Sequence, residues 1–406
     1  MELPGYEVVP QAPQNNSFLI SSFCMDHCPH DGHGGSPFSD GWTLGPLLTL
    51  LFFGMNQPPF GLLIFGISLS KPNASVAIER VFPLMLLASR MGFQGCTVVG
   101  AGVIGLSCGI RLLESGLETR MLSKDVTPHT VSDIAAAWWY PFLAEPVEKT
   151  TRWSVETYYE LLRMKEDLRL GFITMRKGVE YLVEPCPPPG WAGDISHFRA
   201  IRQDEVIEGY QHGWEIEAPV IEMGHYLPWL MERFLSLGGD IELTNIASLS
   251  DINSRLVVNC TGLGARDLCQ DENIVPVRGQ IIYIDQDPGF GRFDQRPENL
   301  IYTIPRRDVT VLGGTAQRGD WYEEIRKEDT LEILQKCSAL WPELDRSKII
   351  GEAVGLRPSR NEVRLEVERS EDSVIIHNYG HGGAGVTLSW GCADEVASLA
   401  QGLLET

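Results

Sequence analysis

A glycine-rich run at residues 100–105 has the G-x-G-x-x-G spacing of a dinucleotide-binding turn. The first glycine of such a run permits a tight turn, the second lets the backbone approach a pyrophosphate, and the third lets a helix pack against a strand. Asp125 lies twenty residues beyond Gly105, where a carboxylate typically binds ribose hydroxyls. The predicted site comprises Gly100, Ala101, Gly102, Val103, Ile104, Gly105, Lys124 and Asp125.

Two features of the C-terminal part also suit ligand binding. A glycine cluster at residues 380–385 precedes a predicted helical tail that begins near Trp390, and unobstructed N–H groups there suit the electron-rich end of a cofactor. Arg357 offers two parallel donors that match a carboxylate. Considered without other information, Arg357 fits a structural salt bridge better than a ligand site.

The glycine run has the local elements that such a site requires. A short apolar, β-branched run at residues 96–99 predicts a buried strand that leads directly into it. A helical pattern follows over residues 106–115 and stops at Gly116, and residues 119–123 predict a second strand. This strand–turn–helix–strand order makes the motif far more specific than the glycine spacing alone.

Composition excludes several classes of protein. The 406 residues carry a net charge of −21, which opposes phosphate binding, and we find no segregated basic patch that would hold nucleic acid. The nine cysteines are odd in number and widely scattered, which favours free thiols in a reducing compartment. No secretory leader pattern opens the chain, so we expect a cytoplasmic protein.

The first 90 residues differ in character from the rest. Residues 41–70 are uncharged and long enough to span a bilayer, but an Asn-Gln-Pro-Pro run at residues 56–59 interrupts them, so a membrane span is not expected. The cysteines and histidines within residues 24–33 match no zinc-module spacing, and we expect a polar loop with no metal. Residues 1–90 are either an unusual extension or sequence upstream of a start at Met91.

Several later segments resemble the D-amino-acid oxidase family of FAD-dependent enzymes. They lie at residues 127–141, 257–265, 276–280, 355–358 and 377–391, and the last is the most specific. The resemblance covers the chain from about Cys96 to its C-terminus. It implies FAD as the cofactor and adds these flavin-site positions: Ser132, Ala136, Ala137, Trp138, Tyr140, Thr261, Gly262, Gly382, Gly383, Ala384, Gly385, Val386 and Thr387.

The same resemblance implies a substrate site. Arg357, in a Gly-x-Arg-Pro motif, matches the arginine that holds the substrate carboxylate, and Tyr302 matches a tyrosine whose hydroxyl helps. Gly383 matches the position whose backbone carbonyl accepts from the substrate amine. No general base is expected, and we expect core packing for two further motif residues, Gln317 and Trp321.

The implied reaction is oxidation of a D-α-amino acid by hydride transfer to FAD. Dioxygen would reoxidise the flavin and give hydrogen peroxide, while the imino acid would hydrolyse to a 2-oxo acid and ammonia. Glu298 replaces a lid tyrosine of vertebrate members, and Ala316 replaces an arginine of D-aspartate oxidases, which favours substrates with neutral side chains. Arg296 and Arg318 lie close enough in sequence to leave that preference open.

Other functions remain open at this point. A D-aspartate oxidase or a glycine- or sarcosine-type flavin amine oxidase would share most of these motifs. A flavin-binding scaffold without turnover is a non-enzymatic alternative, and a nicotinamide dehydrogenase would share only the first glycine run. We expect small-molecule partners, no nucleic acid, and leave a homodimer open.

The resemblance also predicts the organisation of an α/β fold. A discontinuous Rossmann-like FAD-binding domain would take residues 91–145, 240–270 and 350–406. An α+β substrate domain with a mostly antiparallel sheet would take residues 146–239 and 271–349. The proline-rich residues 185–190 should form a surface loop, and Arg360 and Arg364 should be solvated or paired.

Overall fold

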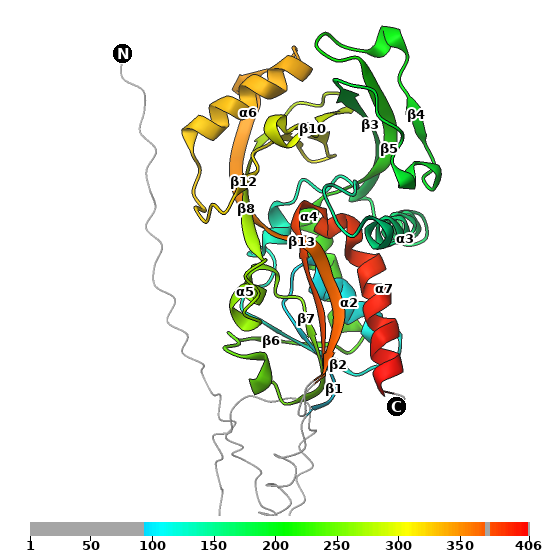
Figure 1. The fold of residues 1–406 in the computed structure, drawn as a ribbon, viewed down its shortest axis with the longest axis vertical. Helices are drawn as coiled ribbons and strands as arrows, with labels where there is room; N and C mark the ends of the chain where they lie inside the picture. Colours follow the sequence, from blue (N-terminus) through cyan, green and yellow to red (C-terminus); the bar gives the residue numbers. More distant parts are fainter. Residues whose placement is uncertain (1–92, 370–373, 405–406) are drawn as a thin grey trace, which may run out of the picture. The chain divides into compact units, whose positions relative to one another are not determined.

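The computed structural model describes residues 93–369 and 374–404 (Figure 1). The predictions for the apolar segment 41–70 and for the Cys/His run 24–33 fall outside the described residues. Within the described part, none of the helices combines the length and the apolar character needed to cross a bilayer.

A single mixed sheet organises the described chain, in the order β4-β5-β3-β9-β10-β11-β8-β13-β14-β7-β1-β2-β6, with β12 paired to β8. Its strands are β1 (Phe93–Val99), β2 (Thr119–Ser123), β3 (Ile173–Leu182), β4 (Phe198–Ala200), β5 (His212–Ile221), β6 (Asp240–Leu243), β7 (Ser254–Asn259), β8 (Val275–Ile284), β9 (Gly291–Asp294), β10 (Ile301–Pro305), β11 (Thr310–Gly313), β12 (Gln317–Arg318), β13 (Ile349–Arg369) and β14 (Val374–His381). The helices are α2 (Val103–Glu114), α3 (Val147–Glu166), α4 (Met223–Ser236), α5 (Ala265–Leu268), α6 (Lys327–Leu340) and α7 (Gly385–Leu404).

Five neighbouring strands, β14, β7, β1, β2 and β6, run parallel. Alternate residues of β1 enter different cores: Val98 packs in the main cluster that also contains residues of α2 and α7, while Val99 packs with Leu249 and Ile252 on the other face. Burial on both faces is why a parallel strand reads as a continuous apolar run. Along this part α2 packs against α7 and α4, and α3 packs against α7.

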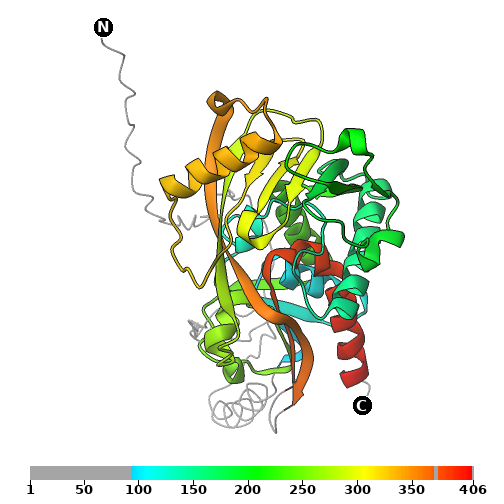
Figure 2. The same cartoon turned by 45° about the horizontal axis from the view of Figure 1, so that its top comes forward.

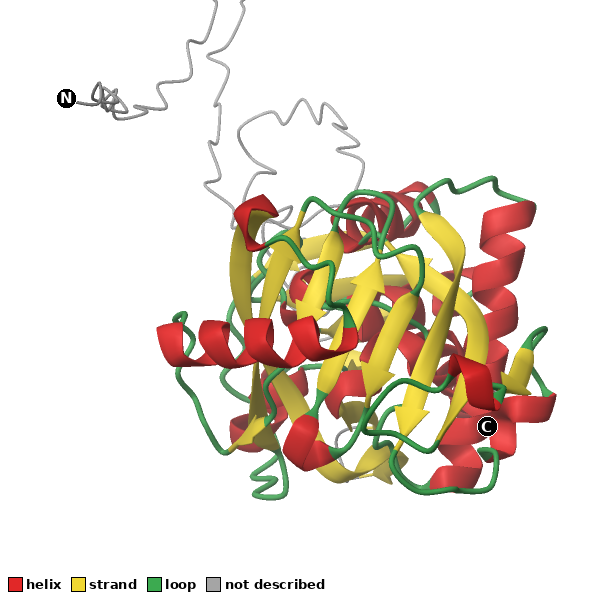
Figure 3. Cartoon of the chain, turned by 90° about the horizontal axis from the view of Figure 1, so that it is seen from above, coloured by secondary structure: helices red, strands yellow, loops and turns green. Residues whose placement is uncertain are grey.

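The remaining strands pair mostly antiparallel, and β9 with β3 is a parallel exception. The long strands β8 and β13 join this part to the parallel part, as the continuous green and orange ribbons in Figure 2 show. Helix α6 buries Ile333, Leu334 and Cys337 against apolar residues of β8, β10 and β11. Figure 3 shows the sheet face on with helices on either side.

The predicted elements are present, but the boundaries of three of them differ from the prediction. Strand 119–123 is confirmed, the strand at 96–99 begins three residues earlier, and the helix expected over 106–115 spans Val103–Glu114. The tail helix begins at Gly385, not near Trp390, so the prediction of its start is wrong. The glycine-rich sequence suggested a loop there, but the last glycine of the cluster already belongs to the first helical turn. The division into two domains stays a prediction, since one sheet runs through both.

Candidate functional site

A cavity of about 640 Å³ lies at the carboxyl ends of the parallel strands. Gly100 follows β1, Lys124 follows β2 and Cys260 follows β7, and all three line the cavity. Ligands of open α/β sheets bind at this edge, where loops and helix N-termini meet.

The glycines of residues 100–105 make close backbone contacts that a side chain would prevent. Gly100 has φ of +104°, and a Cβ on it would lie 2.5 Å from the Cys260 carbonyl oxygen. A Cβ on Gly105 would lie 1.8 Å from the Gly100 carbonyl oxygen. Two hydroxyls also hold this turn, because Ser123 Oγ accepts from Ala101 N and Ser132 Oγ accepts from Val103 N, each at 3.1 Å. The turn before α2 is therefore rigid and open to a ligand's phosphates.

Most predicted cofactor positions line this cavity. They are Gly100, Ala101, Gly102, Val103, Ile104, Lys124, Asp125, Ser132, Ala136, Ala137, Trp138, Tyr140, Thr261, Gly262, Gly382, Gly383, Gly385, Val386 and Thr387. Gly105 and Ala384 are not part of the lining: Gly105 packs against the turn, and Ala384 is fully buried in the main core. Contact of each residue with a cofactor stays a prediction.

The segment from Ala136 to Tyr140 is fixed at both ends. Ile221 N donates to Ala137 O at 3.0 Å, and Ala137 adopts a left-handed φ of 59°. Further along, Tyr140 N donates to Thr387 Oγ1, and the Thr387 hydroxyl donates back to Tyr140 O, each at 3.1 Å. The segment is thereby tied to β5 on one side and to the first turn of α7 on the other.

Glu180 of β3 is a buried carboxyl that the sequence did not reveal. Tyr140 donates its hydroxyl proton to Glu180 Oε2 at 2.9 Å. Burial raises the pKa of Glu180 to about 7 and the Asp294 carboxylate adds to the rise, while the hydrogen bond from Tyr140 opposes it. The available signal in the sequence was a single acidic residue between two hydrophobic ones, Val179 and Tyr181. All three side chains are buried in the structure.

His381, immediately before Gly382, lines the cavity and is buried. Burial lowers the pKa of His381 to about 3, so its imidazole is neutral near pH 7. Its Nε2 lies 3.1 Å from Asn378 Oδ1. A neutral histidine leaves the glycine cluster without an added positive charge.

Arg357 and Tyr302 line the same cavity as the glycine turn, and so does Gly383. Arg357 Nη1 donates to Thr315 O at 2.8 Å, and within the described residues its guanidinium has no carboxylate partner. Burial raises the pKa of Tyr302, and the neighbouring Arg357 guanidinium partly offsets that rise. The unpaired guanidinium distinguishes Arg357 from Arg360, which pairs with Asp271 at 3.0 Å as expected of a structural arginine.

Absent side chains make room for both residues. A Cβ on Gly279 would lie 2.2 Å from Arg357 Nη1. A Cβ on Gly313 would lie 2.0 Å from Tyr302 Cζ, and one on Gly314 would lie 2.7 Å from the Tyr302 hydroxyl oxygen. These glycines come from β8 and from the end of β11. The backbone of two strands therefore forms the floor on which the guanidinium and the phenol lie.

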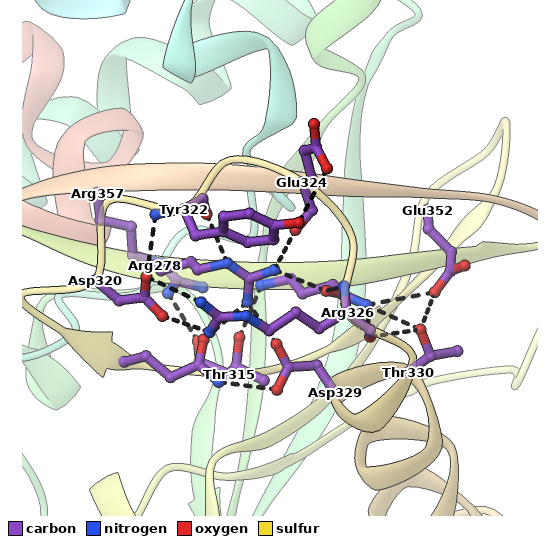
Figure 4. Close-up of polar contacts among 12 residues, drawn as sticks. Arg278, Thr315, Asp320, Tyr322, Glu324, Arg326, Asp329, Thr330, Glu352 and Arg357 are labelled. Atoms are coloured by element: carbon purple, nitrogen blue, oxygen red, sulfur yellow. Dashed lines mark hydrogen bonds and ion pairs between the residues drawn. The ribbon is translucent and has the colours of Figure 1, made fainter.

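Behind Arg357 lies a buried polar network, which Figure 4 shows. Arg278 of β8 is fully buried, forms an ion pair with Asp329 at 2.5 Å, and donates to the Tyr322 and Glu324 carbonyls at 2.7 and 2.6 Å. Thr315 links the network to the cavity, because its hydroxyl accepts from Gln280 N and its carbonyl accepts from Arg357. The network thus fixes residues 314–326, which we call the rim loop.

Two expectations about this region need correction or completion. Core packing for Trp321 is wrong, because Trp321 is 53% exposed on the rim loop, where it lines the cavity. Gln317 is half-buried within the polar network, accepting from Arg278 and donating to Asp329. Sequence reasoning missed Arg278, because a motif alone does not show what its arginine contacts.

The charges near the substrate positions are now defined. Arg296 pairs with Asp294 at 2.5 Å, and neither Arg296 nor the exposed Arg318 is among the residues that line the cavity. Ala316 and Glu298 are exposed.

Arg364 pairs with Glu366 and Glu368, as expected. The exposed loop predicted at residues 185–190 is confirmed.

Comparisons with known proteins agree on the family. A family model described as "FAD dependent oxidoreductase" matches residues 96–399. A D-amino-acid oxidase of Rubrobacter xylanophilus is 42% identical over 75% of this chain and 94% of its own length. A D-amino-acid oxidase of Dictyostelium discoideum is also 42% identical, over 75% of this chain and 91% of its own length.

The fold is shared more widely. A solved glycine oxidase from Bacillus cereus superposes with a TM-score of 0.64 at 18% identity, covering 76% of this chain and 95% of that one. At that identity the likeness shows the fold alone. The family match decides the cofactor as FAD and removes the nicotinamide dehydrogenase as an alternative. The chain therefore belongs to the DAO family of FAD-dependent oxidoreductases.

Proposed function

We propose that the chain oxidises D-α-amino acids with FAD, and that it prefers side chains that are not acidic. The observation that carries this proposal is the Arg357 guanidinium, which lies in the same cavity as the dinucleotide turn and has no carboxylate partner among the described residues. A substrate carboxylate is the group that would match its free donors. Two relatives at 42% identity are D-amino-acid oxidases, which supports the same substrate class.

The residues at the cavity fit an FAD molecule. The turn at Gly100 and Gly102 with the N-terminus of α2 would hold the pyrophosphate, and Asp125 would bind the adenosine ribose. Residues 382–387, at the start of α7, would face the pyrimidine end, where unobstructed N–H groups stabilise negative charge. FAD, when bound, would accept a hydride, which carries two electrons, from the substrate and would pass those two electrons to dioxygen.

The protein's own contribution is orientation. Arg357 would grip the carboxylate with Tyr302 beside it, and the Gly383 carbonyl would accept a hydrogen bond from the substrate amine. With the substrate's carboxylate and amine both fixed, only the D enantiomer would direct its Cα hydrogen toward the flavin. The Cα hydrogen would leave Cα as hydride while the substrate amine is in its neutral form, so no side chain is needed as a base. The imino acid then hydrolyses to a 2-oxo acid and ammonia, and dioxygen is reduced to hydrogen peroxide.

A peroxide assay on the FAD-loaded protein tests this proposal. D-Alanine, L-alanine, D-aspartate, glycine and sarcosine form the substrate panel. We expect peroxide from D-alanine and none from L-alanine, with D-aspartate much weaker. Turnover of glycine or sarcosine in preference to D-alanine, or of D-aspartate above D-alanine, would replace the proposal with one of the related amine oxidases.

The alternative of a flavin scaffold without turnover predicts no peroxide with any member of the panel. The buried ion-paired support behind Arg357 argues for a working site, since a scaffold has no need to hold a free guanidinium in a cavity. A cytoplasmic location and the absence of a nucleic-acid partner remain inferences from composition. A homodimer, and the expectation that residues 41–70 do not span a membrane, stay predictions from the sequence.

A further inference from the structure

His381 lies at the end of β14, between the two glycine-rich parts of the cofactor cavity. The parallel strands β1, β7 and β14 lie side by side, and the last residues of β1 and β7 are aligned with His377 of β14. Neighbouring strands are about 4.8 Å apart, so His377 lies about 10 Å from the end of β1, where the dinucleotide turn begins at Gly100. Strand β14 then continues past this edge to His381, which directly precedes the glycine cluster. His381 is therefore placed between the dinucleotide turn and the start of α7.

One ring nitrogen of His381 is already engaged. Its Nε2 lies 3.1 Å from Asn378 Oδ1, and Asn378 Nδ2 donates to Cys108 Sγ of α2 at 3.2 Å. Since Cys108 takes the amide nitrogen of Asn378, the amide oxygen faces the ring, and that oxygen can only accept. Nε2 of His381 therefore carries the ring hydrogen. All three residues are buried, so this chain of contacts is shielded from water.

The other ring nitrogen, Nδ1, is consequently an acceptor. Burial lowers the pKa of His381 to about 3, so the ring is neutral near pH 7 and Nδ1 keeps its lone pair. The 3-10 turn at residues 382–384 begins directly after His381, but the side chain accepts no hydrogen bond from that turn. Across residues 93–369 and 374–404, no N–H or O–H group meets Nδ1. Because His381 lines the cavity, its free acceptor suits a donor on a ligand.

The position of His381 indicates which part of the cofactor supplies that donor. In the proposed placement of FAD, the pyrophosphate lies at the turn of Gly100 and Gly102, and the pyrimidine end faces residues 382–387. The ribityl chain joins these two parts of the molecule and carries several hydroxyl groups. It would cross the cavity where His381 lies, and each hydroxyl that leaves water there needs an acceptor.

We propose that His381 Nδ1 accepts a hydrogen bond from a ribityl hydroxyl of FAD, and that Asn378 is a positioning residue that keeps the ring hydrogen on Nε2. This inference rests on the placement of FAD in the proposed function and does not depend on the substrate. It adds a cofactor-binding residue that the motifs did not indicate. It also connects the middle of the cofactor to α2, through Asn378 and Cys108.

The affinity of the full-length apoprotein for FAD, measured by quenching of flavin fluorescence, tests this inference without turnover. His381→Leu should weaken FAD binding about fivefold to tenfold, the effect of one lost hydrogen bond in a buried site. His381→Gln should recover part of the loss, because its side-chain oxygen can accept. ADP is the control ligand, since it has the adenosine and the pyrophosphate but no ribityl chain, and His381→Leu should bind it as the wild type does. Unchanged FAD affinity in His381→Leu, or equal weakening of FAD and ADP, would overturn the inference.

A second measurement uses the wild type and so does not depend on a variant that folds. In protein labelled with nitrogen-15 histidine, the His381 ring should carry its hydrogen on Nε2, and the Nδ1 resonance should move on addition of FAD but not of ADP. A hydrogen on Nδ1, or the same movement with both ligands, would overturn the inference. Neither measurement involves a D-amino acid, so failure to oxidise D-alanine would overturn the proposed function alone. A wild type that binds no FAD would overturn both.

Discussion

Substituting Gly279 by alanine perturbs the substrate site without touching a substrate-binding side chain. The new Cβ would lie 2.2 Å from Arg357 Nη1, whereas ordinary contact begins at 3.4 Å, so the guanidinium must move by about 1.2 Å. It can move, because it is the end of a flexible side chain, but the 2.8 Å bond from Nη1 to Thr315 O breaks. A displacement of about 1 Å at a positioning group lowers kcat/KM on the order of 100-fold.

The assay is steady-state peroxide formation from D-alanine, together with FAD affinity and the melting temperature of the holoprotein. We expect a large loss of kcat/KM, mostly through KM, with FAD retained and little change in melting temperature. Gly351→Ala is the control, because it lies on β13 with Arg357 and its Cβ would make an ordinary 3.7 Å contact with Tyr283. A Gly279→Ala protein with wild-type KM would refute the claim that the position of Arg357 controls substrate binding.

Three further changes probe other parts of the site. Gly105→Ala should weaken FAD binding and lower the melting temperature, because its Cβ would meet the Gly100 backbone oxygen at 1.8 Å; unchanged FAD affinity would contradict this. Tyr302→Phe should raise KM for D-alanine by about tenfold through loss of one hydrogen bond to a charged group, with kcat less affected, as kinetics of the holoprotein will show. Glu180→Gln should stabilise the holoprotein increasingly as pH rises. The pKa of Glu180 is raised from 4.5 to about 7, so the folded protein binds the proton more tightly and the wild type loses about 3 kcal/mol across that window. A constant difference in melting temperature between pH 5 and pH 8 would show that Glu180 is not buried as described.

Local sequence patterns predicted the nucleotide end of the site well. The turn at Gly100 and its flanking strand and helix depend on interactions between near neighbours, which residue type and spacing report directly. The start of α7 could not be predicted as well, because glycine has low helix propensity and contacts such as Thr387 with Tyr140 decide the first turn.

The support around Arg357 could not be predicted from spacing. Arg278, Asp329 and Thr315 are far apart in sequence, and their roles follow from how β8, α6 and the rim loop pack. Trp321 was expected in the core because tryptophan is mostly buried, yet the anchored loop holds it at the cavity mouth.

The central claim is that Arg357 holds a D-amino acid beside a flavin. Anaerobic mixing of the FAD-loaded protein with D-alanine tests it most directly, with the absorbance of the oxidised flavin as the readout. The account predicts that D-alanine bleaches the flavin, that L-alanine does not, and that Arg357→Ala binds FAD but stays oxidised with D-alanine. A wild-type flavin that remains oxidised with every D-amino acid, or an Arg357→Ala protein that bleaches at the wild-type rate, would contradict it.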